Sequence, residues 1–110
     1  MLRGYRAMFI LPRGVHIATD ADGSWIFTFS KFLPKDVAEQ VRRNLKFTHS
    51  HEMEENFQGE DLLASLVWNE DGNLEFVYLR FYGGKEIEVP PFLEGMVEGS
   101  EATILQPRAW

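Results

Sequence analysis

The sequence has no cysteine among its 110 residues. A chain without thiols forms no disulfide framework, offers no thiolate nucleophile and builds no cysteine-type zinc site. This composition is compatible with the cytoplasm, which we take as the expected location. A chain of this length encloses a hydrophobic core without covalent or metal support, so residues 1–110 are expected to form a single domain.

Long apolar runs are also lacking. No segment approaches the roughly 18 consecutive apolar residues that a membrane helix requires, so no membrane span is expected. The apolar run at residues 7–11 follows two arginines, as in a signal peptide, but it ends at Pro12 and is shorter than the apolar segment of such a peptide. We interpret this run as a strand of the folded protein.

The motifs of nucleophilic catalysis and of phosphate binding are missing. The sequence contains no Gly-x-Ser-x-Gly elbow. The segment Gly83-Gly84-Lys85 lacks both the earlier glycine and the Ser or Thr that complete a phosphate-binding loop. A hairpin turn explains it fully. The sequence therefore favours a non-enzymatic protein and predicts no cofactor.

Basic residues are outnumbered and unevenly placed. The chain has 11 Lys and Arg against 17 Asp and Glu, which gives a net charge of −6. Eight of the 11 basic residues lie at positions 1–47, whereas 13 of the 17 acidic residues lie at positions 48–110. This asymmetry indicates either a polar surface for a partner or two halves that neutralise each other across the fold. The overall acidity argues against nucleic acid as a partner.

Residues 62–89 show the firmest structural pattern, an antiparallel meander. Strands are predicted at residues 62–68, 74–81 and 86–89, with Asp71-Gly72 and Gly83-Gly84 in the turns. Both faces of the middle strand are largely apolar, which is typical of a strand covered on two sides by a helix, a second sheet or a partner. A homodimer is one way to cover the second face.

The remaining pattern predicts further strands, one helix and one long loop. Strands are expected at residues 4–11, 15–19 and 24–32 and near the C-terminus, a helix at residues 33–47 and a polar loop with a short helical turn at residues 48–61. The fold class is therefore α+β: an antiparallel curved sheet or partly open barrel of six to seven strands with one helix packed on it.

The predicted loop carries the strongest concentration of negative charge. Its acidic residues are Glu52, Glu54, Glu55, Glu60 and Asp61. Such a surface steers association with a basic partner and competes with polyanions. The leading interpretation is therefore an acidic binding or regulatory module, such as an inhibitor of a basic protein, that acts through this loop and the adjoining sheet edge.

Two other sites are candidates. His49 and His51 would project to the same side of an extended segment, and a nearby carboxylate or His16 could complete a metal site. The alternative function is a small-ligand-binding protein or small enzyme with an aromatic pocket between helix and sheet. Its predicted lining is Trp25, Phe27, Trp68 and Tyr78.

Overall fold

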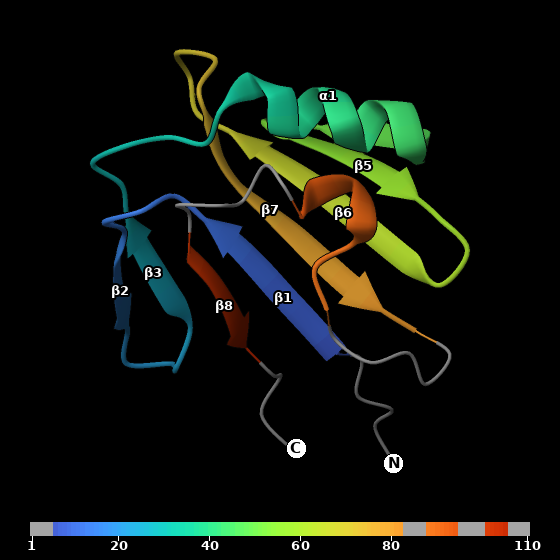
Figure 1. The fold of residues 1–110 in the computed structure, drawn as a ribbon. Coiled ribbons are helices and arrows are strands. Elements are labelled where there is room, and N and C mark those ends of the chain that lie inside the picture. Colours follow the sequence, from blue (N-terminus) through green and yellow to red (C-terminus); the bar gives the residue numbers. More distant parts are fainter. Residues whose placement is uncertain (1–5, 83–87, 95–100, 106–110) are drawn as a thin grey trace.

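The fold combines two antiparallel sheets with one α-helix in residues 6–82, 88–94 and 101–105, which the computed structural model describes (Figure 1). In chain order the elements are β1 (Arg6–Leu11), β2 (His16–Thr19), β3 (Trp25–Thr28), α1 (Lys35–Asn44), β4 (Lys46–His51), β5 (Glu54–Gln58), β6 (Leu62–Trp68), β7 (Leu74–Phe81), the 3-10 helix η1 (Pro91–Leu93) and β8 (Glu101–Leu105). Six strands form one sheet in the order β4-β5-β6-β7-β1-β8, and β2 pairs with β3 in the other. The predicted α+β class is confirmed.

The β6–β7 hairpin forms at the predicted residues because its turn is encoded locally. Asn69 Oδ1 accepts hydrogen bonds of 2.9 Å from the backbone N–H groups of both Asp71 and Asn73. Gly72 adopts a φ of 81°, a left-handed conformation that glycine takes at little cost. These contacts fix the register of the two strands at the centre of the sheet.

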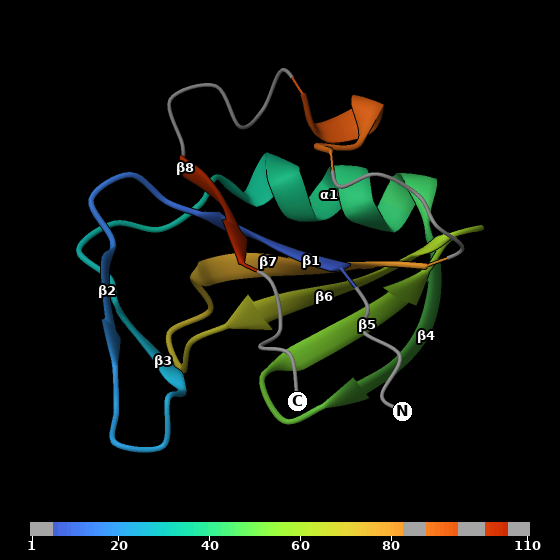
Figure 2. The ribbon, with the colours of Figure 1, turned by 90° about the horizontal axis from the view of Figure 1, so that it is seen from below.

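The middle strand β7 is covered on both faces by the chain itself. On one face Val77 and Leu79 are fully buried in the core beneath α1. On the other face Phe76 packs against Phe27 of β3, with ring centroids 5.4 Å apart. Figure 2 shows α1 on one side of the six-stranded sheet and the β2–β3 hairpin on the other. The second face, on which the expectation of a homodimer rested, is thus partly occupied within one chain.

Helix α1 is shorter than the predicted helix and buries one apolar stripe. Pro34 precedes its first residue with an extended φ of −60° and ψ of 143°, and Leu45 follows its last residue. Val37, Ala38 and Val41 are fully buried, as the spacing predicts. In the described residues, neither α1 nor η1 has the length and apolarity that crossing a membrane would require.

Several details of the predicted fold are wrong. The described residues form eight strands divided between two sheets, instead of six or seven strands in one sheet. The predicted strand at residues 24–32 ends at Thr28. Of the predicted strand at residues 86–89, Glu88 and Val89 are not in a strand and the rest lies outside the described residues. The second neighbour of β7 is β1.

The predicted polar loop at residues 48–61 is also wrong, because most of it belongs to β4 and β5. Phe57 is 2% exposed and pairs with Ala64 of β6, so one aromatic residue anchors the hairpin in the core. The glutamates of this hairpin lie at or beside its turn, where they need no full burial. Tertiary pairing here overrides the loop-like composition.

Glu75 provides a pH test of the β7 packing. It is half-buried next to the register shift of the β6–β7 pair, and burial raises the pKa of its carboxyl above the ordinary value of 4.5. The folded state thus binds this proton more tightly than the unfolded state, and the free energy of unfolding contributed by Glu75 falls as pH rises through the folded pKa. We expect Glu75→Gln to stabilise the protein modestly at pH 7, and the gain to vanish below about pH 4. Urea unfolding at both pH values measures this, and an equal gain at both would contradict it.

Candidate functional site

The β4–β5 hairpin forms one edge of the larger sheet and exposes apolar and acidic groups together. All six residues of β4 are exposed, and in the described part of the chain the strand pairs only with β5. Phe47 on this strand is 52% exposed, and Met53 in the turn is 48% exposed. Glu52, beside Met53, has a φ of 54°, a conformation that is uncommon for a residue with a side chain. The hairpin therefore presents strand backbone, two large apolar side chains near its opposite ends and an acidic turn along one edge of the larger sheet.

Glu55 ties this hairpin to the helix. Its Oε1 atom accepts hydrogen bonds from Arg42 Nη2 at 2.6 Å and from Trp68 Nε1 at 2.9 Å. The Arg42 guanidinium also lies 5.5 Å from the centre of the Trp68 ring, within the range of a cation–π contact. Glu55 is therefore already paired within the chain, whereas Glu52 and Glu54 form no ion pair with any residue that the structure describes. Their charges remain available to a partner.

A wide hollow of about 470 Å³ opens beside Arg42, Glu55 and Trp68. It is lined by Arg42, Glu52, Met53, Glu55, Trp68, Asn69, Glu70 and Gly72. Three of these residues are acidic and one is basic, and that basic residue is already bound to Glu55. The hollow thus extends the acidic surface of the hairpin turn toward the β6–β7 turn.

The predicted acidic set does not form one surface. Glu52, Glu54 and Glu55 lie at or beside the β4–β5 turn, but Glu60 and Asp61 follow the far end of β5, whose five residues span roughly 17 Å. Two separate acidic regions replace the single predicted one.

His49 and His51 lie on the exposed edge strand. Their register partners are Asn56 and Glu54 of β5, which places both histidines on the sheet face opposite α1. The ring of His49 lies within hydrogen-bonding distance of Thr48 Oγ1 (3.0 Å) and 3.4 Å from Asn56 Nδ2. No group of three or more His, Asp or Glu residues suited to a metal ion is found where the chain is described. The two histidines lie on the same face of β4, and the described residues place no third ligand with them. The metal site remains a hypothesis from the sequence.

Three of the four residues of the predicted aromatic pocket are divided between the two faces of the sheet. Trp68 lies on the helix side with Arg42 and Glu55. Phe27 and Tyr78 both pack on Phe9 across the sheet, with centroids 5.3 and 4.5 Å away, and the side chain of Trp25 lies outside the described set. The structure does not bring Trp68 together with Phe27 and Tyr78.

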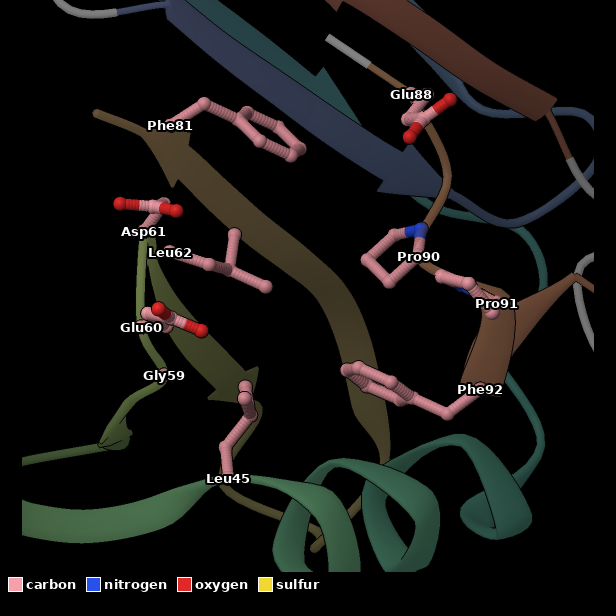
Figure 3. A pocket seen from close by; sticks show the side chains of 10 residues that line it. All are labelled: Leu45, Gly59, Glu60, Asp61, Leu62, Phe81, Glu88, Pro90, Pro91 and Phe92. Atoms are coloured by element: carbon pink, nitrogen blue, oxygen red, sulfur yellow. The ribbon is translucent and has the colours of Figure 1, made fainter. Parts of the chain in front are cut away.

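A cavity that the sequence did not reveal lies at the far end of β5 (Figure 3). Its volume is about 210 Å³, and its lining is Leu45, Gly59, Glu60, Asp61, Leu62, Phe81, Glu88, Pro90, Pro91 and Phe92. These residues come from the end of α1, the β5–β6 turn, the end of β7 and the segment around η1. The only local signal was the Pro90-Pro91 pair, which ends a strand-like pattern but says nothing of what it packs against.

Comparison with known proteins leaves the function to be argued from this geometry. No protein-family model matches the sequence, and searches of curated proteins and of solved structures likewise find no match.

Proposed function

We propose that this protein is a non-enzymatic binding module that engages a basic protein through the β4–β5 hairpin. The observation that carries the proposal is an outermost strand whose six residues are all exposed and which leads directly into an acidic turn. An edge strand offers backbone groups for pairing with an added strand of another chain. Phe47 and Met53 supply the apolar contacts that such a partner would cover.

The charge on the hairpin determines the kind of partner. Glu52 and Glu54 stand free of the Arg42 pair, and Glu70 borders the same hollow. Negative charge at the rim of an interface attracts a basic surface and raises the association rate, with a steep dependence on salt. A protein of this type becomes an inhibitor where the surface that it covers is the partner's own polyanion-binding site.

Charge reversal on the hairpin tests the proposal. The double variant Glu52→Lys/Glu54→Lys spares Glu55, which holds Arg42 and Trp68, and Glu39→Lys/Glu94→Lys reverses two exposed charges elsewhere. With a partner identified by using the wild-type chain as bait, we expect the hairpin variant to lower the association rate at least about tenfold. The control should stay within about twofold. Stopped-flow kinetics at two salt concentrations measures both.

An apolar variant separates contact from charge. Phe47→Ala should raise the dissociation rate of the same complex, because it removes a contact without altering the field. Equal effects of the hairpin and control double variants would show that only net charge matters and would contradict the proposal, as would unchanged binding of all the variants.

A further inference from the structure

We propose that the 210 Å³ cavity at the far end of β5 binds a small amine with an aryl body, whose ammonium group faces Glu60, Asp61 and Glu88. This site is separate from the hairpin and does not depend on the function proposed for it. The inference rests on the size, the rigidity and the charge of the cavity.

The size of the cavity sets the size of the ligand. Protein cavities of about 150 Å³ admit a benzene molecule. A cavity of about 210 Å³ therefore has room for one aromatic ring and a short chain ending in a polar group. Its apolar lining comes from Leu45, Leu62, Phe81, Phe92 and the two prolines. Figure 3 shows the Phe81 and Phe92 rings on different sides of the opening.

The walls are held by contacts that exist without a ligand. The backbone N–H of Gly59 donates to Leu62 O at 2.7 Å, and that of Tyr82 donates to Asp61 O at 3.0 Å. Leu93, next to the lining residue Phe92, is fully buried in the core and donates through its backbone N–H to Pro90 O at 2.9 Å. The cavity is preformed, so little binding energy is lost in ordering it.

The charge of the lining selects a cation. Three of the ten lining residues are acidic and none is basic. Figure 3 shows Glu60 and Asp61 on one side of the opening and Glu88 on the other. Within the described residues, none of the three carboxylates forms an ion pair or a side-chain hydrogen bond. An apolar space bordered by unpaired carboxylates favours an organic cation and repels carboxylate and phosphate ligands.

NMR titration with three isosteric probes tests the proposal. We expect 2-phenylethylamine to shift backbone amide signals of residues 45, 59–62, 81, 88 and 92 in a saturable manner. Neutral 2-phenylethanol should bind at least about tenfold more weakly, and phenylacetate should not bind. Equal binding of the amine and the alcohol would overturn the proposal. So would absence of amine binding, or shifts centred on the hollow at Trp68.

Variants separate the cavity from the rest of the acidic surface. Glu60→Gln/Asp61→Asn/Glu88→Gln keeps the shapes of the side chains and should weaken amine binding at least about tenfold. The hairpin variant Glu52→Lys/Glu54→Lys should leave amine binding within about twofold. The amide spectrum of each variant checks its fold, and unchanged amine binding by the folded triple variant would overturn the inference. Loss of hairpin binding with amine binding retained would leave the inference standing and concern only the proposed function.

Discussion

Phe57→Ala is expected to lower the free energy of unfolding by roughly 3–5 kcal/mol, the usual cost of removing a buried phenyl ring. Phe57 is 2% exposed and belongs to the main core cluster, although the other four residues of its strand are polar or charged. Its removal leaves a cavity between β5 and the helix. Since small domains have only about 5–15 kcal/mol of stability, the variant should be close to unfolding at body temperature.

The matched control is Phe47→Ala on the neighbouring strand. Phe47 is the register partner of Phe57, and the two rings lie 5.6 Å apart in an edge-to-face arrangement. Because Phe47 is 52% exposed, its loss should cost less than about 1.5 kcal/mol, most of it from the aromatic pair. Urea unfolding midpoints of the two variants measure the difference. Equal destabilisation would show that Phe57 does not anchor the hairpin.

The two hairpins of the larger sheet differ in how far the sequence could predict them. The bounds of β6 and β7 follow from local information, because Asn69 and Gly72 define a tight turn between two apolar runs. The β4–β5 hairpin has no such signal. Its turn has Glu52 at a φ of 54°, a position where a glycine would have indicated a hairpin. In β5, Phe57 is the one buried aromatic residue. Only pairing with β6 reveals this segment as a strand.

The candidate sites were predictable in composition but not in arrangement. The acidic residues at the hairpin turn and those at the cavity are close in sequence, yet strand β5 holds them apart. Tyr78 and Trp68 of the predicted pocket lie on opposite faces of the sheet. This separation could not be predicted, because the sequence pattern does not reveal which face of the sheet the helix covers. The cavity needs four segments to meet, and sequence periodicity reports only on one segment at a time.

A buried polar pair between β5 and β6 gives the second large expected effect. Asn56 and Ser65 are register partners, 7% and 3% exposed, and Ser65 Oγ donates a hydrogen bond of 2.6 Å to Asn56 Oδ1. Asn56 also contacts the edge strand: its backbone carbonyl oxygen accepts a 3.1 Å hydrogen bond from Thr48 Oγ1, and its side-chain Nδ2 lies 3.4 Å from His49 Nε2. The pair therefore links the centre of the sheet to the proposed binding edge.

Removing both members of this pair should cost less unfolding free energy than the sum of the two single removals. Ser65→Ala leaves Asn56 Oδ1 buried without its donor, and Asn56→Leu leaves the Ser65 hydroxyl without its acceptor, at roughly 1–3 kcal/mol each. The double variant Asn56→Leu/Ser65→Ala replaces both polar groups by apolar ones, so its loss of unfolding free energy should be smaller than the sum of the two single losses. Urea unfolding of the four proteins completes the cycle. If the two single losses of unfolding free energy simply add, the Asn56 and Ser65 side chains do not stabilise each other. Their hydrogen bond would then make no contribution to the connection between the core and β4.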